Sequence, residues 1–298
     1  YAWGKAASEA HSEVIFAPAK RHEDRVVKLI KGAQRSLDIA MYNMKHSGVV
    51  SALKDAVKRG VKVRFIFHKA QADRKDPQGS RSAGLEDIGV DVRFASKSKV
   101  MHHKFMIVDG LRADDDGTIP YERAASAWLV SGSGNWAQGN HDENTLFLRG
   151  VPELVGHFQG EFNRLWTYSW DFSWKSFPYT PGAALDPAEL VDDPHQDAFF
   201  TSANMKENMS WTIKSGSEVV AQAIVAELDK AETSIDIASG HMRSKTIYDA
   251  LVRIAQDPNK NVRIRVYLDG QEYTAGAYKA YYGYRLHKAG IDVRFKYY

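Results

Sequence analysis

An internal duplication is the sequence feature that most restricts how this chain can fold. Residues 33–40 are echoed 198 positions later by residues 231–238. Residues 89–94 return almost verbatim 201 positions later as residues 290–295, and residues 61–64 have a counterpart at the same spacing. Three matches in the same order at nearly constant spacing indicate that the chain contains two copies of one structural unit.

Each copy predicts helices that alternate with short strands. In the first copy, apolar residues at helical spacing and buried apolar runs predict helices over residues 23–33, 48–59 and 81–88 and strands over residues 37–41, 61–67 and 90–94. Gly60 stands where a glycine is expected to end a helix. The second copy follows the same order, with helices over residues 219–231 and 245–255. This alternation predicts mainly parallel central sheets with helices on both faces.

The pattern places the chain in the α/β class, as two tandem α/β/α lobes. We expect the first lobe over residues 1–178, a linker over residues 179–210 and the N-terminal part of a second lobe over residues 211–298. The linker is expected because a stretch between the copies is bounded by prolines. We expect the second lobe to be incomplete and to leave a sheet edge exposed.

A short polar motif follows the third predicted strand. His102 and Lys104 are separated by one residue, so an extended chain points both side chains to one face and His103 to the other. A neutral imidazole can attack phosphorus, and a lysine beside it can hold anionic oxygens. The turn signal at Asp109 and a second strand leading into Gly132-Ser133-Gly134-Asn135 favour a phosphodiester-cleaving site over the alternative, a surface hairpin.

Composition narrows the possible classes of protein. The chain has a formal net charge of +3 and a pI of about 8.8, which favours an anionic substrate without choosing between lipid and nucleic acid. The absence of cysteine excludes a disulfide, a thiol nucleophile and a thiolate zinc site. The sequence has no stretch long and apolar enough for a transmembrane helix. It begins with Tyr1 rather than Met, as a processed or trimmed protein would, and we expect a secreted or periplasmic location.

The duplicated α/β unit, the His102-x-Lys104-(x4)-Asp109 motif and the downstream Gly132-Ser133-x-Asn135 resemble the phospholipase D superfamily, whose members are also called HKD phosphodiesterases. The resemblance covers nearly the whole chain and implies two tandem lobes of the phospholipase D type. It implies that His102 is a nucleophile or an acid/base partner and that Lys104 and Asn135 bind the phosphate. Ser133 would donate to the phosphate or to the site framework, and Asp109 would hold the motif strand and its loop.

In this superfamily two such motifs meet in one site, so the resemblance implies a second histidine. The repeat spacing places it near position 303, beyond Tyr298. We expect this second HKD motif to come from a following segment, a cleaved chain or another protomer. Related enzymes also use a carboxylate after the Gly-Ser-x-Asn motif to orient a catalytic histidine. This implies such a role for Glu143 or Asp142, with an exposed turn as the alternative.

The expected activity is hydrolysis of a phospholipid headgroup phosphodiester through a phosphohistidine intermediate, with transphosphatidylation to an alcohol as a variant of the same chemistry. One histidine would attack phosphorus while the other protonates the leaving alkoxide. Lysine charge would replace the metal that many phosphodiesterases require, so no metal or other cofactor is implied. The alternative is a metal-independent endonuclease of the same superfamily that cleaves DNA or RNA. A non-enzymatic anion-binding protein is the third hypothesis.

The long gap between Asp109 and Gly132 departs from the superfamily pattern, and it contains the acidic run Asp114-Asp115-Asp116. A calcium loop would need further ligand positions that the sequence lacks, so we expect a solvated hairpin tip. The aromatic-rich stretch 162–179 would suit stacking with nucleic acid or contact with a membrane. A helix over residues 153–166 that packs on the sheet is the alternative for its first part.

Overall fold

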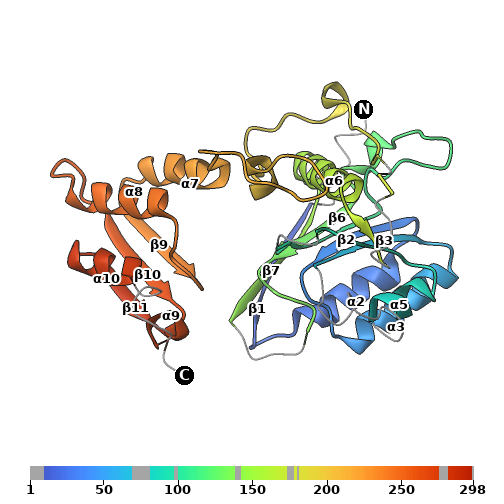
Figure 1. Ribbon diagram of the computed structural model, residues 1–298, viewed down its shortest axis with the longest axis horizontal. Helices are drawn as coiled ribbons and strands as arrows, with labels where there is room; N and C mark the ends of the chain where they lie inside the picture. The colour runs from blue at the N-terminus through green and yellow to red at the C-terminus, as the bar shows by residue number, and fades with distance from the viewer. Residues whose placement is uncertain are drawn as a thin grey trace. The chain divides into compact units, whose positions relative to one another are not determined.

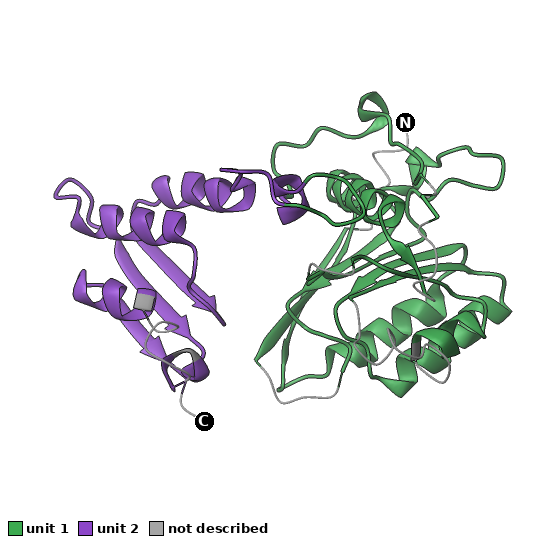
Figure 2. Cartoon of the chain, viewed as in Figure 1, with its two compact units in different colours: residues 1–198, 206–212 green, residues 199–205, 213–298 purple. Residues whose placement is uncertain are grey.

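The computed structural model describes residues 10–68, 81–96, 100–137, 142–172, 178–179, 181–274 and 281–296. The chain divides into two compact units, residues 1–198 with 206–212 (unit 1) and residues 199–205 with 213–298 (unit 2) (Figure 2). Among the described residues, no helix has the length and apolar character needed to cross a bilayer.

Unit 1 is built on a mixed sheet with the strand order β1-β7-β6-β5-β2-β3-β4-β8 in its described part. Its elements in chain order are β1 (His11–Ala17), α2 (His22–Gly32), β2 (Ser36–Met41), α3 (Ser47–Lys58), β3 (Lys62–Phe67), α5 (Arg81–Glu86), β4 (Asp91–Phe94), β5 (Lys104–Val108), β6 (Trp128–Gly132), β7 (Glu143–Arg149), α6 (Pro152–Thr167) and β8 (Trp170–Asp171). The strands β2, β3 and β4 pair in parallel, as the alternation with helices predicted. The strands β5, β6 and β7 join them antiparallel, so that β1, β6, β2, β3 and β4 all point the same way.

Helices cover both faces of this sheet, which confirms the predicted α/β class. On one face, Val26 of α2 and Leu53 of α3 share a buried cluster with Ile39 of β2. On the other face, Phe105 of β5 lies edge-on to Phe162 of α6, with 6.4 Å between ring centroids. Figure 1 shows α2 and α3 on one side of β2 and β3, and α6 on the other side. Burying two faces fixes the register of each strand, because a shift by one residue would turn every apolar side chain to the wrong layer.

Helix α3 ends where the sequence predicted. Gly60 has a φ of +89°, a left-handed conformation that favours glycine. Its N–H donates to the carbonyl of Val57 at 2.9 Å, and the N–H of Val61 donates to the carbonyl of Ala56 at 3.1 Å. These two bonds form the motif that commonly closes a helix, and they direct the chain straight into β3.

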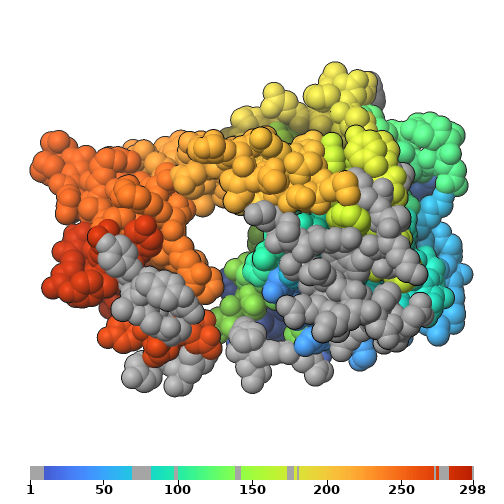
Figure 3. All heavy atoms as spheres, in the orientation of Figure 1, coloured from blue at the N-terminus to red at the C-terminus, as the bar shows by residue number. Residues whose placement is uncertain are grey.

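Unit 2 repeats the parallel part of unit 1. Its main elements are α7 (Val219–Asp229), β9 (Ser234–Ser239), α8 (Lys245–Gln256), β10 (Arg263–Leu268), α9 (Gly270–Thr274), α10 (Tyr281–Lys288) and β11 (Asp292–Phe295). The three strands pair in parallel in the order β11-β10-β9. Asp236 lies opposite Arg265, just as Asp38 lies opposite Arg64 in unit 1, so the duplication read from the sequence extends to strand register. Figure 3 shows the orange residues of α7 and α8 at the surface of unit 2.

The segment predicted as a linker, residues 179–210, includes residues that pack on unit 1. Asn163 of α6 donates from Nδ2 to the carbonyl of Ala183 at 2.8 Å, and the N–H of Asp186 donates to the hydroxyl of Tyr121 at 2.6 Å. Farther along, Trp211 is buried and donates from Nε1 to the carbonyl of Tyr168. Residues 199–205 belong to unit 2 and residues 206–212 to unit 1, so this segment contributes to both units, and its role as a linker stays a prediction.

Candidate active site

The segment that leads into β5 places His102 and Lys104 on one side of the sheet and His103 on the other. His102 is exposed, and its ring meets the Tyr42 ring edge-on, with 4.5 Å between centroids. Lys104 is 7% exposed, and its ammonium lies 5.1 Å from the centroid of the same ring. His103 instead lies 3.2 Å from a carboxylate oxygen of Glu161 in α6. The alternation predicted from the spacing is confirmed.

Lys104 holds its charge in a position that water reaches poorly. Its Nζ donates a hydrogen bond of 2.8 Å to the backbone carbonyl of His102. Burial lowers the pKa of Lys104 to about 8, although the negative charge of Glu143 acts in the opposite direction. The lysine is therefore still protonated at neutral pH. A cation that is weakly hydrated attracts an anionic oxygen more strongly than one in open water.

Tyr42 and His68 complete an aromatic cluster that the sequence did not single out. Tyr42 follows β2, and its ring stacks on that of His68, with centroids 4.9 Å apart and an interplanar angle of 18°. The N–H of Met101 donates to Nδ1 of His68 at 3.3 Å, which leaves a neutral His68 with its proton on Nε2. Both residues stand at the carboxyl ends of adjacent parallel strands, a common place for sites in α/β sheets, and that position is the signal that could have found them.

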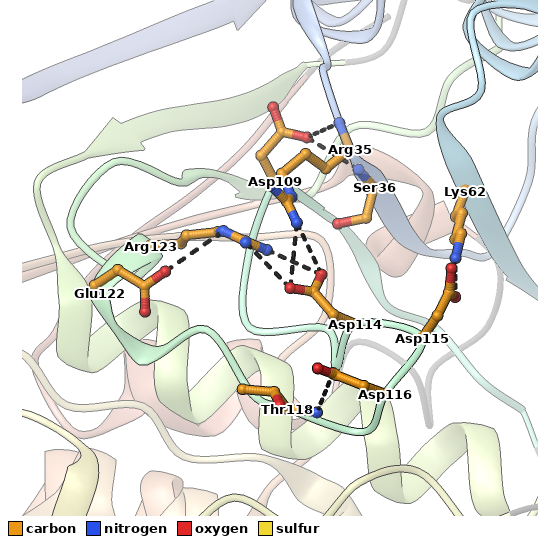
Figure 4. Close-up of polar contacts among 10 residues, drawn as sticks. All are labelled: Arg35, Ser36, Lys62, Asp109, Asp114, Asp115, Asp116, Thr118, Glu122 and Arg123. Atoms are coloured by element: carbon orange, nitrogen blue, oxygen red, sulfur yellow. Dashed lines mark hydrogen bonds and ion pairs between the residues drawn. The ribbon is translucent and has the colours of Figure 1, made fainter.

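Asp109 ties the far end of β5 to the start of β2. Its carboxylate accepts hydrogen bonds from the backbone N–H groups of Gln34, Arg35 and Ser36, at 3.0, 2.7 and 3.0 Å. Figure 4 shows the bonds from Arg35 and Ser36. Its own backbone has a φ of +55° where the strand ends and the chain turns. Five strand residues separate it from the His102 end, a span of roughly 20 Å at the usual rise of a strand. This geometry supports the predicted role of holding the motif strand rather than contacting substrate.

The Gly-Ser-Gly-Asn segment forms a tight loop after β6. Ser133 is exposed, and its hydroxyl accepts a hydrogen bond from the N–H of Asn144 at 3.0 Å, while its own N–H donates to the Asn144 carbonyl at 2.9 Å. The hydroxyl therefore contributes to the loop framework. The side-chain Oδ1 of Asn135 is buried and has no hydrogen-bond partner within the described part of the chain. A side-chain amide in that position keeps hydrogen-bonding capacity for a ligand.

Buried histidine His22 fixes this loop, and sequence analysis missed it. His22 begins α2, is 3% exposed, and places Nε2 3.1 Å from the backbone carbonyl of Asn135. A side chain at Gly134 would lie 2.8 Å from the His22 ring, so only glycine lets the loop approach this closely. The backbone N–H groups of Lys45 and His46 donate to the carbonyl of Trp136 on the other side of the loop. No local spacing links these segments, which are far apart in sequence.

Glu143 lies near enough to Lys104 for its charge to act on the lysine. It is the first residue of β7 and pairs in register with Ala17 of β1. Its negative charge reaches Lys104, which is the interaction that favours the protonated lysine. The neighbouring Asp142 is exposed. The structure thus gives Glu143 a position near the lysine of the motif, and its predicted action on a histidine stays a prediction.

Comparison with known proteins identifies the family. Residues 26–166 match the family model described as cardiolipin synthase, PLD-like domain. The mitochondrial cardiolipin hydrolase of Xenopus laevis is 31% identical over 167 residues, which cover 52% of this chain and 70% of that protein. The chain belongs to the phospholipase D superfamily. The mitochondrial cardiolipin hydrolase of Drosophila melanogaster is 29% identical over 153 residues, which cover 49% of this chain and 59% of that protein.

The fold of this phospholipase D superfamily member is also similar to a solved structure along its whole length. The crystal structure of phosphatidylserine synthase from Haemophilus influenzae Rd KW20 has a TM-score of 0.55 and 10% sequence identity, and the match covers 100% of this chain and 78% of that one. At this identity the likeness shows the fold alone. The chain spans about three fifths of the length of the first curated relatives that it matches.

Within the phospholipase D pattern, the long insertion between the two halves of the motif is held by ion pairs. Asp114 accepts hydrogen bonds from both Arg35 and Arg123, and these contacts hold the pKa of its carboxyl below the usual range, with Arg123 as the larger cause. Asp115 pairs with Lys62, and Asp116 accepts from the N–H of Thr118 (Figure 4). Each carboxylate has a separate partner, as expected for a hairpin tip. The described residues include no cluster of three metal-ligating side chains.

Proposed function

We propose that this chain is a phosphodiesterase that hydrolyses the headgroup phosphodiester of a phospholipid through a phosphohistidine intermediate. The observation that carries the proposal is the meeting of His102 and Lys104 at the Tyr42 ring in a member of the phospholipase D superfamily. Relatives named mitochondrial cardiolipin hydrolase favour a phospholipid over a nucleic acid, and cardiolipin is the first substrate to test.

The chemistry proceeds in two steps. The imidazole of His102 attacks phosphorus in line with the leaving alkoxide, so that a P–N bond forms as the P–O bond to the leaving group breaks. A second histidine gives its proton to the leaving oxygen and then accepts a proton from the water that hydrolyses the phosphohistidine. That histidine belongs to the second HKD motif, supplied by a following segment, a cleaved chain or another protomer. An alcohol in place of water gives transphosphatidylation.

The remaining site residues hold the phosphate. The protonated Lys104 binds a non-bridging oxygen through a charge-assisted hydrogen bond, which strengthens as negative charge builds up in the transition state. Asn135 contributes its side-chain amide from the loop that His22 fixes. Ser133 holds that loop against Asn144, and Glu143 keeps Lys104 charged.

The test uses the full chain on cardiolipin vesicles, phosphatidylcholine vesicles and plasmid DNA. We expect release of a phosphatidic acid from vesicles and a loss of roughly a thousandfold or more on His102→Ala, because the nucleophile is removed. A quenched reaction should carry acid-labile phosphate on the peptide that contains His102. The matched control His195→Ala removes an exposed histidine away from the motif and should keep wild-type activity.

Three outcomes would overturn the proposal. Full activity of His102→Ala would remove the nucleophile assignment. Cleavage of DNA without cleavage of either lipid would make the chain a nuclease. Cleavage of none of the three substrates by a folded protein that also carries the second HKD motif would remove the enzymatic claim.

A further inference from the structure

The segment that carries His102 extends past the paired part of β5. In the described residues, the pairing of β5 with β2 ends at Lys104, and its pairing with β6 ends at Phe105. Beyond this point the backbone N–H of Tyr42 still donates to the carbonyl of His103 at 2.9 Å. The sheet thus guides the segment along its β2 side, and further contacts decide which way its side chains point.

The side chain of His103 makes such a contact on the side of the sheet that α6 covers. Its Nε2 lies 3.2 Å from Oε1 of Glu161. Its ring also meets the Phe105 ring edge-on, with 5.5 Å between centroids. Because successive side chains of an extended segment point to opposite faces, holding His103 against α6 turns His102 and Lys104 toward the other face.

Helix α6 is a firm base for this contact. Phe105 of β5 lies edge-on to Phe158 and Phe162 of α6, with 5.1 and 6.4 Å between ring centroids. Phe162 is fully buried. Glu161 lies between these two aromatic residues in the sequence, so the packing that joins α6 to β5 also fixes the place of its carboxylate.

Glu161 carries a charge that is buried and depends on its partners. Its side chain is 0% exposed, and Arg164, one helical turn later, pairs with its second carboxylate oxygen. Burial alone would raise the pKa of Glu161, but the contacts with His103 and Arg164 outweigh it and hold that pKa below its usual value. The group is therefore a carboxylate at neutral pH. An imidazole nitrogen satisfies a carboxylate only while it carries a proton, so Nε2 of His103 is a donor toward Glu161.

We propose that Glu161 is a positioning residue that acts through His103 on the nucleophile His102. The inference rests on the proposed function, in which His102 attacks phosphorus. In-line attack tolerates little error in position, and a displacement of about 1 Å can cost on the order of a hundredfold in rate. Lys104, by contrast, is the first residue of the paired strand, so the sheet itself holds it. Loss of the Glu161 carboxylate therefore lowers kcat more than it changes KM.

The first test measures kinetics on cardiolipin vesicles with the protein that also carries the second HKD motif. Glu161→Met removes the carboxylate at similar size, and we expect kcat to fall by roughly tenfold or more with KM changed by less than about twofold. Glu161→Gln keeps an oxygen that can accept from Nε2 of His103 and should recover most of the loss. The matched control is Gln159→Leu, which removes another buried polar side chain of α6, one that donates to Asp38 at 2.7 Å. It should lower stability and keep kcat within about twofold of the wild-type value.

A double-mutant cycle tests whether Glu161 acts through His103. His103→Phe and Glu161→Met should each lower kcat, and the double variant should be no slower than the slower single variant. Effects that multiply in the double variant would mean that the two residues act independently, and this outcome would overturn the proposal. If Glu161→Met does not fold, Glu161→Gln and His103→Phe complete the same cycle.

A second readout does not require turnover. NMR of the chain with labelled histidine and tyrosine rings follows the contact between His102 and Tyr42. Glu161→Met should shift the ring signals of His102 and weaken its cross-peaks to Tyr42, whereas Gln159→Leu should leave both unchanged. If these shifts occur in a protein that cleaves none of the substrates, the proposed function fails and the positioning contact stands. Unchanged His102 signals in Glu161→Met, or an equal loss of kcat in Gln159→Leu, would overturn the positioning role.

Discussion

The ring of Tyr42 meets the ring of His102 edge-on, with 4.5 Å between their centroids. Aromatic contacts of this kind contribute about 0.5–1.5 kcal/mol beyond the area that they bury. Tyr42 thus positions the proposed nucleophile and also stacks on the ring of His68. A residue at the end of one strand orients a residue at the beginning of another.

We expect Tyr42→Leu to lower kcat by about three- to tenfold, because the contact energy with His102 is lost. Tyr42→Phe keeps the ring and should retain most of the activity. The measurements are steady-state kinetics on vesicles and the pKa of His102 followed by NMR in both variants. Tyr284→Leu, at an exposed tyrosine of α10, is the control. Equal activity of Tyr42→Leu and Tyr42→Phe would show that the ring has no positioning role.

The lowered pKa of Lys104 predicts that activity falls on the basic side of the pH–activity profile. Because burial lowers its pKa to about 8, the charge that binds phosphate is lost as the pH rises through that value. We expect kcat/KM to fall above about pH 8 in the wild-type protein. Lys104→Arg, whose guanidinium stays charged, should have lower activity but no fall near pH 8. A fall in kcat/KM near pH 8 in both the wild-type protein and Lys104→Arg would assign that fall to another group.

The lowered pKa of Lys104 also has a consequence for stability. Between about pH 8 and the ordinary lysine pKa, the unfolded chain binds more protons at this residue than the folded chain, so its contribution makes the free energy of unfolding rise with pH. Lys104→Met should therefore raise the melting temperature at pH 7 and remove this pH dependence. Thermal denaturation at pH 7 measures the first effect, and urea denaturation at pH 7 and pH 9.5 measures the second. A lower melting temperature of Lys104→Met at pH 7 would contradict the prediction.

We expect the carboxylate of Asp109 to stabilise the folded state. Asp109→Ala leaves three backbone N–H groups without their acceptor, and we expect a loss of about 2 kcal/mol in the free energy of unfolding. Thermal and urea denaturation test this. Asp116→Ala, at the exposed tip of the insertion, is the matched control and should change stability by less than about 0.5 kcal/mol. Equal stability of the two variants would show that the loop does not depend on the Asp109 carboxylate.

His22 should act on substrate binding through the loop that it fixes. In His22→Ala, the Asn135 carbonyl loses its donor and a cavity opens beside Gly134. We expect KM to rise by about tenfold with a smaller change in kcat, since the amide of Asn135 would be held less firmly. His22→Gln keeps a donor of similar reach and should restore most of the loss. A fall in kcat with unchanged KM would place His22 in another role.

Much of the architecture was predictable because the information is local or repeated. The duplicated segments predicted the strands that carry Asp38 and Asp236, and the structure places both in the same register. The spacing of His102 and Lys104 alone predicted their common face, since a strand alternates every residue. Gly60 ends its helix as expected.

What sequence analysis missed depends on contacts between distant segments. His22 lies 113 residues before Asn135, and no pattern of spacing relates the two. Tyr42 and His68 acquire their role only when β2 and β3 pair and the segment before β5 crosses their ends. The order of strands in the sheet decides these meetings, and the sequence predicted the presence of the strands without their order.

The antiparallel pairing of β5 with β2 separates the insertion between β5 and β6 from the segment that carries His102. It places His102, which lies just before β5, near the carboxyl end of β2, and the connection from β5 to β6 therefore lies at the opposite ends of these strands. The insertion that contains Asp114, Asp115 and Asp116 lies at those opposite ends, where Asp114 pairs with Arg35 just before β2 (Figure 4). A change in the length of the insertion therefore acts on the part of the sheet that lies away from His102 and Lys104.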